Sequence, residues 1–393
     1  MNNSINPVLG EQLFDPLTLP TFLGGESDSG VDWSGYDNTS NTTPVVFNTE
    51  STSYCTVLTI DQTHLLLVYR GFASKARARI VEINPSDGSI TTSGSEAELT
   101  ADSVQGITAC LLDSTHAVIG LEDAGELRAQ VIEFSGTTIS TVGSVVNFET
   151  VGSESLSLTA LSSTVFLYAY EKSSDGTGNV YYGSVAGTIV TAGNKLAFEP
   201  NQAINPAQSI QIKKMRSDKA VIIAGHDGAD DMEAYLISVS GTTPVLDHQV
   251  SVKSVALTTF NAVSIDRLTD TTMLVAFNDY DAVNHEAAII TEASDELTST
   301  TPVEIFSNIV AHSSLVAIDE NQAMLTTIVQ DDGIYTNLIA ISGTTITPGT
   351  SYEVVNGDKE WVSTSLATDN DYISVMYEDD DNSSKGTLIL LKP

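Results

Sequence analysis

Carboxylates crowd five short stretches of the chain, and these are the first places to look for chemistry. The stretches read EDAGE (122–126), HDGADDMEA (226–234), NDYDAVNHEA (278–287), QDDG (330–333) and EDDDNSS (378–384). Oxygen ligands from Asp and Asn suit calcium, and paired carboxylates can hydrolyse glycosides. No stretch has EF-hand spacing, and any acidic surface offers many carboxylate pairs. A solvated acidic rim and a rim that binds calcium both remain open, and no other cofactor is indicated.

Motifs for other catalysis are missing from the sequence. The six histidines are scattered, and no H-E-x-x-H pair offers a zinc site. There is no G-x-S-x-G nucleophile elbow and no glycine-rich phosphate loop after a strand. His64 and His116 occupy equivalent positions before two similar apolar runs, which indicates a shared repeat rather than a site. The sequence therefore predicts a protein that is not an enzyme.

Basic and aromatic residues are few enough to stand out. Lys and Arg number 16 against 51 Asp and Glu, a formal charge of -35. One basic run, RGFASKARAR, carries Arg70, Lys75, Arg77 and Arg79, and a second, KKMRSDK, spans residues 213–219. Either run fits a contact with an acidic partner or local charge balance. Tyr280 and Tyr335 lie in or beside acidic stretches and are candidate platforms for a sugar.

The elements that would position these residues form a repeat. Seven apolar runs recur about 50 residues apart, a period typical of propeller blades. They read HLLLVY, HAVIGL, VFLYAY, AVIIAG, MLVAF, AMLTTIV and YISVMY. Short runs of this type between polar turns are strands covered on both faces. The turn SGTT follows the third strand of several units, where glycine supplies the positive φ of a tight hairpin.

Units of four antiparallel strands at this spacing predict an all-β fold, a seven-bladed β-propeller over residues 43–393. The last unit ends after its third strand, GTLILLKP, while TPVVFN (43–48) resembles the outer strand of another unit, TPVEIF (301–306). We therefore expect the segment at 43–48 to pair with the C-terminal strand and close the ring, so that no sheet edge is left free. The two cysteines, Cys55 and Cys110, fall on different strands, so buried free thiols are favoured over a disulfide.

Residues 1–42 are of a different kind and form the predicted N-terminal arm. The segment lacks periodicity but carries apolar anchors, so it either wraps along the propeller, docks on a partner or sister copy, or stays disordered. The candidate docking residues are Phe14, Leu17, Leu19, Phe22, Leu23, Trp33 and Tyr36. The first 30 residues lack the basic head of a signal peptide, and no stretch approaches the roughly 18 apolar residues of a membrane helix. The acidity disfavours nucleic acid and anionic membranes as partners.

The composite unit resembles repeats of β-propeller proteins in tailed-phage virions. The resemblance rests on Thr43 to Tyr54, Leu112 to His116 and the SGTT hairpins with their continuation at Thr344 to Thr347. The third and fourth units depart from it, with AGT for SGTT and MRSDK for LDSTH. The resemblance implies a structural or host-contacting component of a virion, tail-associated or on its surface, that is assembled in the host cytoplasm.

The sequence thus leads to a non-enzymatic virion protein attached by its arm to capsid or tail proteins or to its own copies, and in contact with a host receptor. A carbohydrate-binding lectin or adhesin is the alternative, and a glycan-processing hydrolase at the centre of the propeller is a third. Two buried carboxylates that face each other within about 10 Å at the central opening would favour the hydrolase.

Overall fold

The computed structural model describes residues 33, 36, 41–123, 125–150, 152–200, 204, 210–226, 231–254, 262–279, 283–308, 310–329, 332–367 and 372–392. These residues form an all-β structure whose only helices are two single turns, η1 (Phe72–Ser74) and η2 (Asp380–Asn382). No helix among them is long and apolar enough to cross a membrane. The predicted arm residues Phe14, Leu17, Leu19, Phe22 and Leu23 lie outside the described residues.

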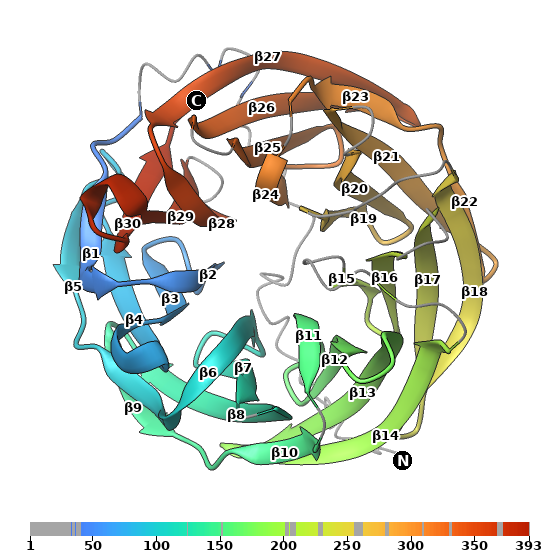
Figure 1. Cartoon of the computed structure of the whole chain (residues 1–393), viewed down its shortest axis with the longest axis horizontal. Coiled ribbons are helices and arrows are strands. Elements are labelled where there is room, and N and C mark those ends of the chain that lie inside the picture. The colour runs from blue at the N-terminus through green and yellow to red at the C-terminus, as the bar shows by residue number, and fades with distance from the viewer. Residues whose placement is uncertain are drawn as a thin grey trace, which may run out of the picture.

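The strands form six antiparallel sheets arranged around one axis (Figure 1). Five of the sheets are separate blades, which we name by their strands. Four of them follow one another along the chain. Blade β11–β14 contains β11 (Ser153–Ser162), β12 (Val165–Lys172), β13 (Thr177–Ala186) and β14 (Ile189–Glu199), and blade β15–β18 contains β15 (Ile210–Arg216), β16 (Lys219–Gly225), β17 (Asp231–Ser240) and β18 (Thr243–Ser254). Blade β19–β23 contains β19 (Ser264–Thr269), β20 (Thr272–Asp279), β21 (Asn284–Ala293), β22 (Glu296–Ser299) and β23 (Val303–Phe306), and blade β24–β27 contains β24 (Val310–Ala317), β25 (Gln322–Val329), β26 (Gly333–Ser342) and β27 (Thr345–Asn356). The fifth, the closure blade, contains β28 (Lys359–Ala367), β29 (Tyr372–Asp379), β30 (Lys385–Leu391) and β1 (Val45–Ser51).

The sixth sheet has nine strands, so the ring differs from the predicted seven separate blades. It comprises β2 (Ser53–Thr59), β3 (His64–Arg70), β4 (Lys75–Ile83), β5 (Ile90–Ser93), β6 (Ala97–Leu111), β7 (His116–Asp123), β8 (Glu126–Ser135), β9 (Thr138–Val142) and β10 (Val146–Glu149). The long strand β6 joins its two halves, because residues 97–103 pair with β4 and residues 104–111 pair with β7. No proline or tight turn separates these two parts of β6, so the sheet continues where the repeat predicts a break.

Closure of the ring by the two chain ends is confirmed. β1 pairs antiparallel with β30, with Val45 opposite Leu388 and Val46 opposite Thr387. Ahead of β1, the backbone N–H of Thr42 donates to the Leu390 carbonyl at 3.0 Å. The last blade therefore takes its outer strand from the start of the propeller, as the sequence predicts.

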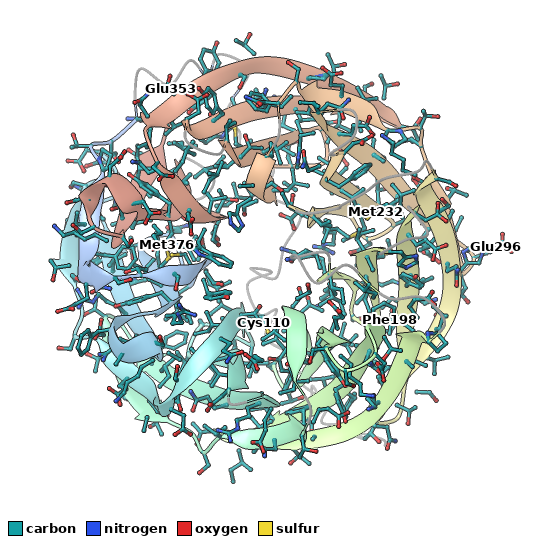
Figure 2. The ribbon with its side chains drawn as sticks, in the orientation of Figure 1. Cys110, Phe198, Met232, Glu296, Glu353 and Met376 are labelled. Atoms are coloured by element: carbon teal, nitrogen blue, oxygen red, sulfur yellow. The ribbon has the colours of Figure 1, made fainter. Side chains whose placement is uncertain are left out.

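The core lies between neighbouring sheets, where side chains from the facing strands fill the space between one sheet and the next (Figure 2). The second strand of each unit is almost wholly buried, as in β16, where all seven residues are buried. Cys110 lies near the axis in Figure 2, and Cys55 belongs to a different hydrophobic cluster. Both cysteines are free and buried, which confirms the prediction.

Side chains also join the inner strands of neighbouring blades. In each case a Ser, Thr or Asp oxygen on one inner strand accepts the backbone N–H of the next at 2.9–3.1 Å. The donor and acceptor residues are Val57 and Ser363, Thr59 and Ser365, Ile212 and Ser157, Lys214 and Thr159, Ala317 and Asp266, and Thr364 and Ser314. Inner strands face the axis and have no further strand to pair with, so these side chains satisfy backbone groups that would otherwise be unpaired.

The predicted turns form as expected. Gly136, Gly241 and Gly343 of the SGTT hairpins all have positive φ, between 53° and 63°. In the turn before β3, Asp61 Oδ1 accepts the backbone N–H of Thr63 at 2.8 Å and of His64 at 2.9 Å. The imidazoles of His64 and His116 each contact the Asp three residues earlier, so both histidines are turn residues.

Candidate ligand site at the closure of the ring

One rim of the ring carries the connections that lead into the inner strands together with the loops between second and third strands. Backbone hydrogen bonds link the two sets: Ser173 N–H donates to Gly152, and Asp380 N–H donates to Asp358. This rim holds the acidic stretches predicted from the sequence, and we call it the acidic rim. The candidate site lies on it, where the closure blade meets β2 and β3.

Two glutamates face each other at this point. Glu360 on β28 is directly opposite Glu378 on β29 in the strand register. Side chains opposite each other on antiparallel strands have Cβ atoms about 5 Å apart, and like charges in such a pair repel. Glu378 is only 6% exposed and Glu360 is exposed, so the pair opens to solvent on one side.

Burial and neighbouring carboxylates keep a proton on this pair. The pKa of Glu378 is raised from 4.5 to about 8, mainly by burial and then by the charges of Asp380 and Glu360, while Ser384 and Arg70 act in the opposite direction. The pKa of Glu360 is also raised, first by burial and then by Asp380. At neutral pH the Glu378 carboxyl therefore largely keeps its proton and can donate a hydrogen bond.

Four side chains form a contiguous row beside the two glutamates. The guanidinium of Arg70 lies 5.1 Å from the ring centre of Tyr54, whose ring centre is 3.9 Å from that of Trp361. The ring centre of His312 lies 4.7 Å from that of Trp361. The row thus spans the nine-stranded sheet, the closure blade and β24. Because each ring touches a neighbour, the row is a fixed wall rather than a set of separate platforms.

Backbone bulges orient the side chains of two aromatic residues in the row. Tyr54 and Trp361 both have φ of 51°, and the strand registers of β2 and β28 shift at these positions. A bulge re-aims a side chain, and a non-glycine residue at positive φ costs roughly 1–3 kcal/mol. Burial lowers the pKa of His312 to about 4, so its imidazole is neutral at the end of the row.

The other residues of the first basic run form pairs within the nine-stranded sheet. Lys75 Nζ lies 2.7 Å from Glu98, and Arg77 pairs with Glu96 and, at 3.4 Å, with Glu98. Arg79 donates to the Phe47 carbonyl at 2.7 Å and lies 4.0 Å from Glu96. Arg70 has no hydrogen bond or ion pair of this kind within the described residues. Of the four basic residues in the run, it is therefore the one whose charge is available to the candidate site.

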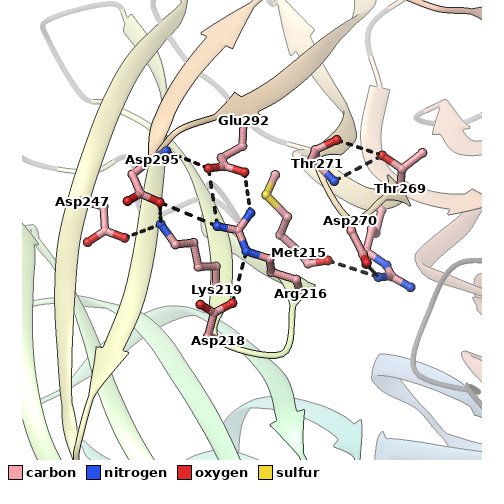
Figure 3. A network of polar contacts seen from close by, with 11 residues as sticks. Met215, Arg216, Asp218, Lys219, Asp247, Thr269, Asp270, Thr271, Glu292 and Asp295 are labelled. Atoms are coloured by element: carbon pink, nitrogen blue, oxygen red, sulfur yellow. Dashed lines mark hydrogen bonds and ion pairs between the residues drawn. The ribbon is translucent and has the colours of Figure 1, made fainter.

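The second basic run is engaged in a network between blades β15–β18 and β19–β23 (Figure 3). Arg216 pairs with the buried carboxylate of Glu292 and lies 3.7 Å from Asp295. Lys219, only 5% exposed, pairs with Asp295 and with Asp247 at 2.9 Å. These contacts correspond to the local charge balance that the sequence left open.

The remaining predicted aromatic residues lie elsewhere. Trp33 is 0% exposed and Tyr36 4%, and both pack in the hydrophobic cluster between blade β24–β27 and the closure blade. These two side chains are therefore buried against the propeller itself. Tyr335 is partly exposed, its hydroxyl donates to Asp332 at 2.8 Å, and it belongs to blade β24–β27 rather than to the closure blade. Tyr280 lies outside the described residues.

Lysine and arginine side chains neutralise carboxylates in three of the acidic stretches. Arg128 pairs with Asp123 at 2.6 Å and with Glu126 at 2.5 Å. Lys359 lies 2.8 Å from both Asp379 and Asp381 and is 4% exposed. In the stretch at 278–287, Lys253 pairs with Asp279 and, at 2.6 Å, with Glu286. Calcium at the acidic rim stays a prediction.

A shallow cleft lies beside Lys253, between β18 and the segment 299–302. Ser and Thr side chains line it together with Val252, Lys253, Glu286 and Pro302. Because Lys253 and Glu286 pair with each other, the charges of the cleft are already balanced. The Glu360 pair has no such balance, which makes it the stronger candidate.

Sequence reasoning selected Arg70 and the acidic stretch that begins with Glu378, but it missed the other residues of the site. Glu360, Tyr54, His312 and Trp361 carried no recognisable motif. A usable signal was present, because Tyr54 in STSY and Trp361 in DKEW begin inner strands at the same position of two repeats. Two aromatic residues at one repeat position, in units that closure makes neighbours, indicate a contact.

Comparison with known proteins identifies the fold. No family model matches the chain, and no curated protein matches it. Among solved structures, the BP39L lectin of Burkholderia pseudomallei aligns with a TM-score of 0.60 and 10% identity, over 85% of this chain and 94% of the lectin. The WD40 domain of Toxoplasma gondii coronin aligns with a TM-score of 0.55 and 9% identity, over 89% and 86% of the two chains.

An oligogalacturonate lyase in complex with manganese aligns with a TM-score of 0.51 and 13% identity, over 88% of this chain and 90% of the lyase. The similar structures thus include a lectin, a WD40 domain and an enzyme, so the likeness does not decide between binding and catalysis. At these identities it establishes the fold alone. The chain is an all-β β-propeller with blades of antiparallel strands.

Proposed function

We propose that the protein is a non-enzymatic propeller that binds a polyhydroxylated ligand, a glycan, at the Glu360 and Glu378 pair. The observation that carries the proposal is the register of β28 and β29, which sets one protonated and one exposed carboxyl group side by side. A donor and an acceptor at one place suit a sugar, whose hydroxyl groups both donate and accept hydrogen bonds.

The surroundings of the pair fit the same ligand class. Arg70 adds a guanidinium that has no carboxylate within ion-pair distance among the described residues, and the row from Tyr54 to His312 adds an aromatic wall. A small number of polar groups beside an aromatic surface is typical of sites that bind small ligands. A partly aromatic and partly charged site disfavours a purely apolar ligand.

To describe where the site lies in the ring, we propose that the ring consists of seven repeating units. Each half of the nine-stranded sheet has the strand order of a separate blade, and β6 serves as the outer strand of one and the inner strand of the next. On this count the candidate site lies between the seventh and first units. A ring closed by its own chain ends holds the two walls of the site in fixed positions.

We propose that this site acts on a virion, because the repeats resemble those of β-propeller proteins in tailed-phage virions. On a particle attached through residues 1–42, a glycan site on the acidic rim would make contact with a host surface. This part of the proposal rests on the sequence, and truncation of residues 1–32 tests it. We expect the truncated protein to fold with an unchanged circular dichroism spectrum and to be lost from assembled particles; its normal incorporation would refute the attachment role.

Binding is tested with a glycan array followed by titration of the best glycan. Glu360→Gln and Arg70→Gln change exposed or partly exposed side chains and should each weaken binding by about tenfold or more. Lys75→Gln is the matched control, since Lys75 lies in the same basic run but pairs with Glu98 away from the site. No binding of any glycan at millimolar concentration, or equal weakening by Lys75→Gln, would overturn the proposal.

A second candidate, a glycan hydrolase, is favoured by the same pair. A carboxyl group with a raised pKa beside a second carboxyl group is the pairing of general acid and nucleophile that a retaining glycosidase uses. Only Glu378 of the pair is buried, whereas the hydrolase expected from the sequence requires two buried carboxyl groups at the central opening. Release of new reducing ends from a bound glycan, abolished by Glu378→Gln, would establish the hydrolase; binding without release supports the binding protein.

A further inference from the structure

His285 is a fully buried histidine whose ring makes no hydrogen bond. It lies on β21, its exposed fraction is 0%, and neither Nδ1 nor Nε2 has a partner among the described residues. A neutral imidazole carries one N–H donor and one acceptor lone pair, so both lose their hydrogen bonds to water without replacement. An unpaired buried group of this kind costs stability and requires an explanation. The proposed glycan site makes no use of this residue.

The other repeats show that the fold does not need a polar residue at this position. His285 is the second residue of a third strand, opposite Asn278, the seventh residue of the second strand. The residues at the same position of the other six strand pairs are Ala76, Leu127, Gly178, Met232, Ile334 and Gly386. All six are apolar or glycine, and all are buried. The histidine therefore departs from the pattern that builds the ring.

His285 faces the seam between blade β19–β23 and blade β24–β27, where seam means the contact surface of two neighbouring blades. Alternate residues of a strand share one face of the sheet. Ala287 and Ile289, the next alternate residues of β21, pack in one hydrophobic cluster with residues of β25. The imidazole therefore points toward blade β24–β27.

The two cross-strand neighbours of His285 make contact across the same seam. Asn278, opposite His285 on β20, accepts the backbone N–H of Val310 on β24 at 3.4 Å. Phe306, opposite His285 on β23, has its ring centre 5.5 Å from that of Tyr335 on β26. The imidazole thus lies between two contacts that hold the blades together, and water can reach it only if the seam opens.

Blade β24–β27 offers no counterion for a charged imidazole. At this end of the seam its described ionisable groups are Tyr335 and Glu353, which lie opposite each other on β26 and β27. The Tyr335 hydroxyl donates to Asp332 at 2.8 Å. His312 on β24 lies on the other face of the sheet, in the row beside the glycan site. No ion pair joins any of these groups to His285.

The charges on the blade of His285 itself are engaged elsewhere. Asp279 and Glu286 pair with Lys253 of β18, which lies on the opposite face of the sheet. Glu304 on β23 is opposite Glu286 and is exposed. Within the described part of the chain, no carboxylate is therefore in ion-pair distance of His285.

We infer that the seam between blade β19–β23 and blade β24–β27 is an acid-sensitive joint of the ring, which opens when His285 takes up a proton. A protonated imidazole carries a full charge and two N–H donors, and the closed seam gives neither donor an acceptor. In the open seam, water solvates the ion. The inference concerns the conformation of the ring and does not depend on the proposed glycan function.

Burial determines the pH range over which the joint responds. It lowers the pKa of His285 from 6.5 to about 3 in the closed seam, while the hydrated imidazole of the open seam titrates near its ordinary value. Below about pH 6.5 the open seam therefore binds a proton that the closed seam excludes, so acid favours opening. The equilibrium constant for opening should rise about tenfold per pH unit between roughly pH 6 and pH 4. Above pH 6.5 both states are neutral, and the joint is insensitive to pH.

Hydrogen exchange of the full chain at pH 7.5 and pH 4.5, corrected for the intrinsic rate of exchange, tests the inference. The Val310 amide is the reporter, because its hydrogen bond to Asn278 crosses the seam. We expect its opening constant to rise roughly a hundredfold between the two pH values. The Ile212 amide, which donates to Ser157 across a different seam, is the reference within the same molecule.

His285→Leu and His285→Met identify the group that responds. Leu127 and Met232 occupy the same position in other repeats, so both variants should fold. Each should abolish the acid response at Val310 and leave exchange at Ile212 as in the wild type. His116→Gln, which changes a partly exposed turn histidine, should keep the full response. No rise at Val310 in the wild type, or a rise that persists in both His285 variants, would overturn the inference.

Discussion

Ser363 Oγ on the inner strand of the closure blade accepts the backbone N–H of Val57, on the inner strand of the nine-stranded sheet, at 3.0 Å. The bond crosses the place where the two ends of the chain meet. It complements the pairing of β1 with β30 on the outside of the same blade. The ring is thus closed at both its inner and its outer edge, and the closure blade that carries the Glu360 pair takes part in both contacts.

Ser363→Ala should destabilise the protein by about 1–3 kcal/mol, because it leaves the Val57 N–H without its acceptor. Urea unfolding followed by tryptophan fluorescence measures the change. Ser140→Ala is the control, since Ser140 is exposed on β9 and its loss should alter the free energy of unfolding by less than about 0.5 kcal/mol. Equal effects of the two substitutions would contradict the role given to the inner bond.

Phe47→Ala should cost about 3–5 kcal/mol, the usual range for a buried phenylalanine. Phe47 lies on β1, is 6% exposed, and its ring centre is 5.2 Å from that of Tyr69. Val45 on the same strand is 39% exposed, so Val45→Ala is a matched control with a small expected effect. If thermal unfolding gave similar melting temperatures for both variants, β1 would not be an integral strand of the closure blade.

Glu378→Gln should become more stabilising as the pH rises. The pKa of Glu378 in the folded protein, about 8, lies above its ordinary value of 4.5, so between these values the folded state keeps a proton that the unfolded chain has lost. The wild-type carboxyl therefore costs stability increasingly from about pH 4.5 to pH 8, and a neutral glutamine removes that cost.

Denaturant unfolding at several pH values measures the difference between this variant and the wild type. The difference should be smallest near pH 4.5 and level off above pH 8. Glu296→Gln serves as the reference, because Glu296 lies exposed at the outer edge of the ring (Figure 2). A difference for Glu378→Gln that does not change with pH would exclude the shifted carboxyl.

Neither cysteine should react with a thiol reagent in the folded protein. Burial raises the pKa of Cys110 to about 12 and that of Cys55 well above its ordinary value, so the reactive thiolate is scarce at neutral pH. A chromogenic disulfide should detect no thiol in native buffer and both thiols in guanidinium chloride. Rapid labelling of the native protein would show that the cores around the two cysteines open readily.

Local sequence was enough to determine the strands, the turns and the closure of the ring. A strand is encoded by the alternating or continuous apolar residues within it. A tight hairpin is encoded by a glycine that adopts positive φ, as Gly136 and Gly343 do. The match between the segment at 43–48 and an outer strand was visible because each repeat supplies a template for the others. Propeller architecture follows from such patterns.

Only the tertiary structure decided what the polar residues do. Glu378 faces Glu360 because of the strand register, and the charge of Arg70 acts on Glu378 because closure brings the first and last units together. β6 runs through two units because nothing in its sequence stops it. Composition shows how many charges a chain carries, but the pairing of Lys219 with Asp247 and Asp295 follows only from how neighbouring blades are arranged. Charges act over a few ångströms, and those distances are set by segments far apart in the chain.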